Sequence, residues 1–138
     1  MLGRVLLLGL ALVMAGCAVI PLQPPEEIVR ARAQAQAQAL VDQDFEKALS
    51  YTTPGYRNSL RSQYYQANHS GSSFWNATEV RWVRCDDVPD PERCSVRVWI
   101  YGQFPQPGRY SGQRGIDAPA SLDTIWIKID RQWYQYLE

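Results

Sequence analysis

The pattern of hydrophobic and polar positions changes its period once along the chain. From Glu26 to Val41, apolar residues recur every three or four positions and fall on one stripe, which predicts a helix. Alanine and glutamine dominate this segment, and both favour helices over strands. Beyond Phe74 the apolar residues alternate instead, which predicts strands. Helices followed by antiparallel strands predict an α+β fold with the helices on one sheet face.

Two shorter helices are predicted before the strands. Asp44 can cap a helix that continues to Tyr51, and Thr53 followed by Pro54 is a second start signal. This third helix would carry aromatic and apolar residues at a spacing of four, namely Tyr56, Leu60 and Tyr64. The serine- and glycine-rich run at 68–73 predicts a loop that ends it.

Four strands are predicted, at residues 79–85, 94–101, 122–129 and 132–137. Asp130 and Arg131 would form a two-residue turn between the last two strands. The segment 102–120 is rich in glycine and proline and is long for a structureless loop. It therefore either contains a short edge strand around 109–111 or forms a mobile functional segment.

The N-terminal residues carry the pattern of an export signal. Arg4 precedes an apolar run at 5–15, which is shorter than the roughly 20 residues that span a bilayer. The run ends in Met14-Ala15-Gly16-Cys17, which resembles the lipobox of bacterial lipoproteins. An uncleaved transmembrane helix and an ordinary signal peptide cut near Ala15 are the alternatives.

The lipobox resemblance implies that the thiol of Cys17 is acylated and that Cys17 becomes the new N-terminus. The chain would then divide into a signal peptide at 1–16, a lipidated cysteine with a proline-rich tether at 17–25, and a single α+β domain at 26–138. Ala18 follows the cysteine in place of aspartate, which in Gram-negative relatives implies the outer membrane, facing the periplasm.

Composition narrows the choice of partners. The chain has 14 basic and 14 acidic residues and no formal net charge, so nucleic-acid binding has no electrostatic support. Eight tyrosines and five tryptophans are many for 138 residues, and we expect them to pack the core or to line a cavity.

Cys85 and Cys94 lie at the facing ends of the first predicted hairpin. Export would place them in an oxidising compartment, which predicts a disulfide, and lipidation of Cys17 accounts for the third cysteine. A metal site would need two further ligands, and His69 is the only histidine. A redox pair usually has the tighter Cys-x-x-Cys spacing.

Two segments resemble nuclear transport factor 2-like domains. Residues 39–51 and 53–57 resemble the opening of that fold, including its Asp-aromatic-x-x-Ala segment at Asp44, Phe45 and Ala48. Residues 125–134 resemble its final hairpin, although Arg131 stands where glycine often occupies the turn. The resemblance covers about 26–138 and implies a cone-shaped fold, in which a curved antiparallel sheet wraps around the N-terminal helices and a pocket lies inside.

Pairing Cys85 with Cys94 would place Val83 opposite Val96 and Arg81 opposite Val98. Arg81 would then either extend to water or recognise an anionic group in the pocket. On the other sheet face we expect Val80, Trp82, Trp99 and Tyr101, with Arg97 in a cation–π contact over Trp82.

The last hairpin supplies the other candidate pocket residues. Tyr134 and Tyr136 fall on the face of Ile125 and Ile127, either in the core or as polar groups of the cavity, and Asp123 could point inward. The candidate pocket therefore consists of Arg81, Asp123, Tyr134 and Tyr136.

We found no catalytic set in the sequence. His69 lies in a serine- and glycine-rich loop typical of a solvated histidine, and Asp42 and Asp44 break and cap helices. We therefore expect no metal and no cofactor. The expected function is that of a membrane-anchored envelope lipoprotein whose non-catalytic domain binds a small ligand or an envelope protein. The alternatives are a SnoaL-like or ketosteroid isomerase-like enzyme and a scaffold subunit of an envelope or secretion complex, since members of this superfamily share a fold and not an activity.

Overall fold

Helices come first in the structure and an antiparallel sheet follows. A computed structural model describes residues 22–104, 116–117 and 119–138 of the chain. The helical elements are α1 (Pro25–Val41), α2 (Phe45–Ser50), α3 (Pro54–Arg57), the 3-10 helix η1 (Leu60–Tyr64), α4 (Tyr65–Asn68) and the 3-10 helix η2 (Ser70–Phe74). The strands are β1 (Trp75–Cys85), β2 (Arg93–Phe104), β3 (Ile116–Asp117), β4 (Ala120–Ile129) and β5 (Gln132–Tyr136).

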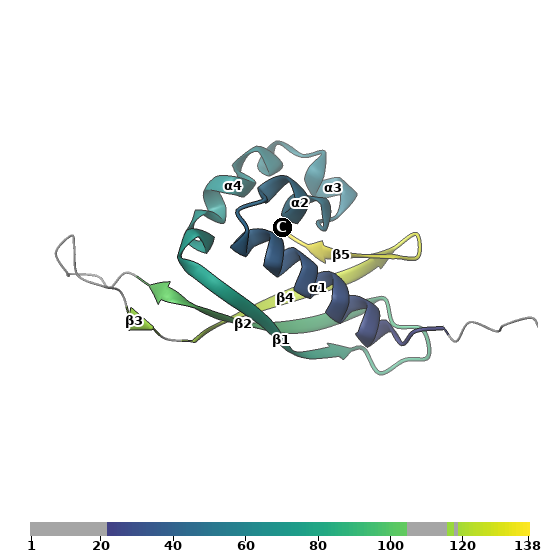
Figure 1. Ribbon diagram of the computed structural model, residues 1–138. Coiled ribbons are helices and arrows are strands. Elements are labelled where there is room, and N and C mark those ends of the chain that lie inside the picture. The colour runs from purple at the N-terminus through teal and green to yellow at the C-terminus, as the bar shows by residue number, and fades with distance from the viewer. Residues whose placement is uncertain (1–21, 105–115, 118) are drawn as a thin grey trace, which may run out of the picture.

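The sheet has the order β1-β2-β4-β5, with β3 paired to the end of β2, and its strand pairs are antiparallel. Helix α1 crosses one face of the sheet, and the shorter helices lie beyond it on the same side (Figure 1). The α+β class and the packing of N-terminal helices on a curved antiparallel sheet are therefore confirmed.

The main core lies between α1 and the sheet. Val29, Ala33 and Ala37 of α1 pack on sheet residues, which are Val80, Cys94, Val96, Val98, Trp126 and Trp133. A second buried cluster joins the end of α1 to α2, α3 and α4, and consists of Ala39, Leu40, Ala48, Tyr56 and Tyr65. Small alanine side chains on α1 allow it to approach the sheet closely.

Polar side chains of α1 bond to both outer edges of the sheet. At the β1 edge, Arg30 donates to Val80 O at 2.7 Å, and the Gln34 side chain bonds Thr78 O at 3.1 Å and Val80 N at 3.0 Å. At the β5 edge, Arg32 donates to Trp133 O at 2.6 Å. These bonds satisfy backbone groups that an open sheet edge would expose.

The predicted start signals of α2 and α3 are confirmed. The Asp44 side chain accepts from Lys47 N at 3.1 Å, and the Thr53 hydroxyl accepts from Tyr56 N at 3.3 Å. Helix α1 begins with Pro25, one residue earlier than expected.

The prediction of one third helix is wrong, because the segment breaks into α3, η1 and α4. Ser59 has an extended backbone, and the Ser59 and Ser62 hydroxyls donate to nearby backbone carbonyls, which competes with helix continuation. Tyr56 is buried, whereas Leu60 is 77% exposed and Tyr64 63% exposed. The predicted loop at 68–73 instead contains most of η2.

Both ends of the segment 102–120 belong to strands. Gln103 pairs with Asp117 in the same register in which Ile100 pairs with Ala120. Strand β2 therefore forms one long hairpin with β3 and β4. The edge strand expected around 109–111 lies outside the described residues.

The sulfur atoms of Cys85 and Cys94 are joined, as predicted, and Val83 pairs with Val96. The expected pairing of Arg81 with Val98 is wrong. A bulge between Val80 and Trp82 shifts the register, so that Val80 pairs with Val98 and is buried beneath α1. Val80 therefore does not share the face of Trp82, and Arg81 is turned to the surface.

The turn at Asp130 and Arg131 has the expected two-residue form, with φ of 49° and 65°. Glycine is required at position 102, because the backbone of Phe74 and Trp75 approaches this residue too closely for a Cβ atom. A Cβ placed there would lie 2.1 Å from the Phe74 carbonyl oxygen and 3.1 Å from Trp75 Cα.

Candidate functional site

An open groove lies where the helices leave part of β4 uncovered. Strand β5 ends at Tyr136, opposite Ile125, whereas β4 begins at Ala120. The groove, which we call the β4 groove, has a volume of about 740 Å³, within the range of ligand sites. Its lining residues come from the α4–η2 turn, the sheet and the C-terminus: Asn68, His69, Gly71, Ser72, Trp75, Arg93, Leu122, Asp123, Thr124, Ile125, Ile127, Gln135, Tyr136, Leu137 and Glu138.

The wall of the β4 groove is mainly apolar. Leu122 is 38% exposed and Tyr136 is 46% exposed, so both present surface to the groove. Leu137 also packs against the second buried cluster, which joins the end of α1 to α2, α3 and α4. An apolar wall with a few fixed polar groups is typical of a binding site.

His69 supplies one of these fixed polar groups. Its ring stacks on Tyr65 at 4.1 Å between centroids, and its Nδ1 atom lies 2.8 Å from Tyr65 O. A carbonyl only accepts hydrogen bonds, so Nδ1 donates, and Nε2 is the acceptor in the neutral ring. His69 is therefore half-buried in the groove wall and is not the solvated loop histidine that the sequence suggested.

Gln135 supplies a second fixed group from the buried side. Its side-chain oxygen accepts a hydrogen bond from Gln36 of α1, and both residues are buried. The neighbouring Tyr65 hydroxyl is buried with no hydrogen-bond partner in the described structure, and burial raises the pKa of Tyr65. Gln135 therefore gives the groove a buried, uncharged amide.

Asp123 and Tyr136 are the two predicted pocket residues that the groove brings together. Asp123 lines the rim of the groove, where its carboxylate pairs with Arg97 on the sheet face away from the helices. Arg97 Nε and Nη2 donate to its two carboxylate oxygens at 2.7 Å each. These hydrogen bonds lower the pKa of Asp123, so the group stays ionised at neutral pH.

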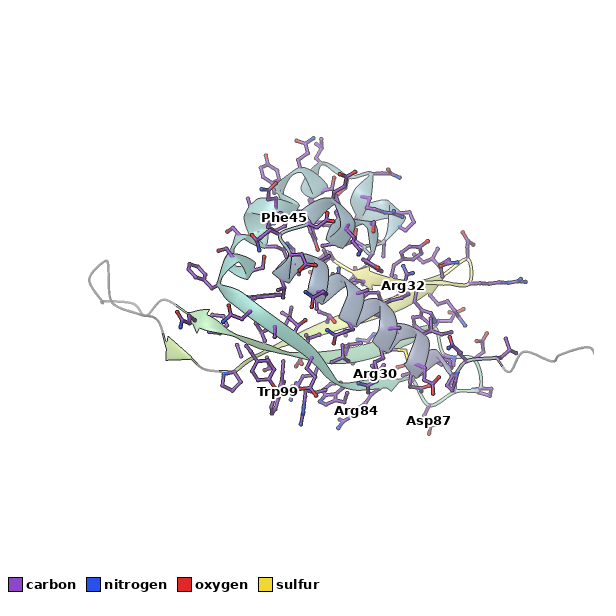
Figure 2. All side chains as sticks on the ribbon, in the orientation of Figure 1. Arg30, Arg32, Phe45, Arg84, Asp87 and Trp99 are labelled. Atoms are coloured by element: carbon purple, nitrogen blue, oxygen red, sulfur yellow. A yellow bond between two sulfur atoms is a disulfide. The ribbon has the colours of Figure 1, made fainter. Side chains whose placement is uncertain are left out.

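Arg81 does not reach the groove. Its guanidinium lies 4.1 Å from the Trp99 ring centre and 3.2 Å from a Glu79 oxygen. Trp99 and Arg84 project from the sheet face opposite the helices (Figure 2). The interpretation of Arg81 as a pocket arginine is therefore wrong, whereas the predicted contact of Arg97 with Trp82 is confirmed at 5.1 Å.

Tyr134 also lies elsewhere. It pairs with Ile127 as Tyr136 pairs with Ile125, which is the predicted register. Its ring, however, is contacted by two guanidinium groups, Arg32 at 5.6 Å and Arg57 at 5.7 Å. Tyr134 therefore joins β5 to α1 and α3.

Several groove residues were not identified from the sequence, namely His69, Trp75, Leu122 and Leu137. Their common signal is that each lies at the end of an element, and the sequence does not show that these ends meet. Cys17, the predicted lipidation site, lies outside the described residues. Within those residues no helix is long and apolar enough to cross a membrane, and no cluster of three potential metal ligands occurs.

No protein-family model matches the chain, and no curated protein matches it significantly. Among solved structures, the chain is similar to a SEC-C motif containing protein from Psychrobacter arcticus, with 14% identity and a TM-score of 0.56. That match covers 80% of this chain and 59% of the other, so the chain corresponds to less than two thirds of that protein.

Two other solved structures are more distant. A SEC-C motif containing protein from Rhodopseudomonas palustris has 19% identity and a TM-score of 0.48, with 82% of this chain and 75% of the other covered. A protein from Campylobacter jejuni, provisionally described as an NTF2-like transpeptidase, has 14% identity and a TM-score of 0.45, with 77% and 94% covered. At 14% identity, the similarity to the Psychrobacter arcticus protein concerns the fold alone.

Proposed function

We propose that this protein is a lipid-anchored envelope protein whose domain binds a ligand or a protein partner in the β4 groove without catalysing a reaction. The observation that carries this proposal is an open, mainly apolar groove in which the carboxylate of Asp123 is already paired with Arg97. A general acid in such a site would need a pKa raised towards neutrality, and the pKa of Asp123 is lowered instead.

We assign the domain to the nuclear transport factor 2-like superfamily as part of the same proposal. Two things support this assignment: the resemblance of residues 39–57 and 125–134, and a curved sheet that encloses helices with an open cavity at one end. The superfamily contains enzymes as well as binding proteins, so the shape of the domain does not by itself choose between them.

The anchor would hold the groove near a bilayer. If Cys17 is lipidated, the segment that leads to Pro25 spans at most about 29 Å at full extension. The proposed location is the bacterial outer membrane, facing the periplasm, which would restrict partners to envelope components.

Site-specific photo-crosslinking in cells tests the binding proposal. We expect benzoylphenylalanine at Leu122, in the groove, to give a defined adduct, because an occupant of the groove would contact that side chain. The matched control is benzoylphenylalanine at Leu60, which is more exposed but lies on η1, outside the groove. Equal labelling from both positions, or no adduct from position 122, would contradict the proposal.

A further inference from the structure

We infer that the occupant of the β4 groove is an extended peptide segment of a partner protein, which pairs with the free edge of β4 as an added strand. This inference rests on the proposed binding function and names the kind of partner. It is carried by the backbone register of the sheet, by the unpaired backbone groups at the start of β4, and by the chemistry of the two walls.

The register shows which backbone groups of β4 face the groove. Gln135 N donates to Tyr51 O at 2.8 Å, and Gln135 O accepts from Thr53 N at 3.1 Å, so Gln135 directs its backbone away from β4. Its partner Trp126 must therefore direct its own backbone groups towards β2, because the two kinds of pair alternate in an antiparallel ladder.

The same alternation extends along the rest of β4. The odd-numbered residues direct their N–H and C=O groups towards the β5 side, and three of them, Ile125, Ile127 and Ile129, pair with β5. Ser121 and Asp123 follow the same rule, but β5 has ended at Tyr136. Among the described residues, none pairs with Ser121 or Asp123 on that side.

Hydrogen bonds cover parts of the other two sheet edges. Side chains of Arg30 and Gln34 bond to the β1 edge. The β5 edge is bonded by Arg32 and by the backbone of Tyr51 and Thr53. An unprotected edge of unpaired N–H and C=O groups is a template for another strand, and peptide recognition by strand addition uses such edges.

The walls of the groove define the chemistry of the added strand. Successive side chains of a strand point to opposite faces. One set would lie against Trp75, Leu122 and Leu137, which favours apolar residues at alternate positions. The other set would lie near the Arg97–Asp123 pair and Tyr136, where polar residues are accommodated. Pairing with both Ser121 and Asp123 requires a segment of about five residues.

The inference is tested by measuring how tightly selected peptides bind to two variants at position 123. Heptapeptides are selected from a displayed random library on the purified full chain, and their affinities are measured by fluorescence anisotropy. Asp123→Ala and Asp123→Pro both lose the side chain, but only proline removes the N–H that faces the groove, and proline is tolerated where a strand N–H is unpaired. We expect Asp123→Pro to bind about tenfold more weakly than Asp123→Ala, as for one lost hydrogen bond.

A second measurement keeps the test valid if Asp123→Pro does not fold. In an added strand, alternate N–H groups of the peptide face β4 and the others face away. N-methylation of an amide that faces β4 should weaken binding to the unaltered protein about tenfold, whereas N-methylation of a neighbouring amide that faces away should weaken it much less. Equal affinities of the two variants, equal effects of the two N-methylations, or failure to select any peptide would overturn the inference. A defined adduct from position 122 in those cases would leave the binding function in place with a different occupant, whereas no adduct would remove both.

Discussion

At the scale of single residues, the Arg97–Asp123 pair fixes the charge state of one carboxylate on the groove rim. Both side chains are well exposed, so solvent screens their attraction and their contribution to stability is small. The pair affects protonation instead, because two hydrogen bonds from Arg97 favour the charged form of Asp123 and lower its pKa. At Asp123 the rim therefore carries an ion pair.

Removing the guanidinium group should raise the pKa of Asp123. We expect Arg97→Gln to move this pKa upwards, towards the ordinary aspartate value of about 3.9. The pair stabilises the fold above that value, and its contribution is lost as the pH falls through the lower folded-state pKa. NMR titration of the Asp123 carboxyl carbon measures the shift. Arg84→Gln is the control, since Arg84 lies over Trp82 instead, and an unchanged Asp123 pKa in Arg97→Gln would contradict the assignment.

The buried Gln36–Gln135 pair is a residue-scale feature that the sequence conceals. Gln36 lies within an alternating run of alanine and glutamine, and its neighbours Gln34 and Gln38 bond to β1 and to Asp42. In the sequence these three glutamines have the same alanine neighbours, so nothing there distinguishes the buried one. Only the position of β5 against α1 determines which of them is buried, so the buried amide in the groove could not be predicted.

At the scale of elements, the β4–β5 turn carries a local strain. Asp130 and Arg131 both have positive φ, the conformation of a type I′ turn, in which glycine avoids the clash of a Cβ. Such a clash costs about 1–2 kcal/mol, whereas glycine loses about 0.5–1 kcal/mol through the flexibility of the unfolded chain.

Arg131→Gly should therefore raise the free energy of unfolding by about 0.5–1 kcal/mol. Urea unfolding followed by circular dichroism measures the change. Arg131→Ala removes the same charged side chain but keeps the Cβ atom, so this variant should gain nothing. A comparable gain in both variants would show that the charge, and not the backbone conformation, was responsible.

Elements with a local cause could be predicted, and elements that depend on distant contacts could not. The caps at Asp44 and Thr53 and the two-residue turn follow from neighbouring residues, as does the pairing of Cys85 with Cys94. The bulge in β1 has a non-local cause, because it places Val80 beneath α1 and exposes its backbone groups to Arg30 and Gln34. Leu137, just after the end of β5, likewise packs against a cluster whose residues come from four helices.

At the scale of the whole molecule, the proposed anchor and the domain are directly connected. Helix α1 starts at Pro25, so the tether ends where the structured domain begins. The same helix packs on the sheet and bonds to two of its edges. A domain held in this way would keep a limited distance from the bilayer while its groove remained accessible.

Cys17→Ser should leave an uncleaved precursor, because a hydroxyl at this position does not accept the lipid that lipoprotein processing requires. Cell fractionation and the intact mass of the protein measure the outcome. Cys94→Ser is the control, since it removes the Cys85–Cys94 bridge but leaves the lipobox intact, and this variant should still be processed and membrane-bound. Normal processing and retention of Cys17→Ser would contradict the anchor.

Gly102 links the shape of the groove to a position that lies outside it. The atoms that would collide with a Cβ at this position belong to the backbone of Phe74 and Trp75, so no change of rotamer can relieve the collision. Even alanine would have to push the η2–β1 junction outwards and carry the Trp75 indole with it. A genetic screen for variants of this domain that no longer bind their partner would thus recover substitutions of Gly102, although this residue does not contact the bound molecule.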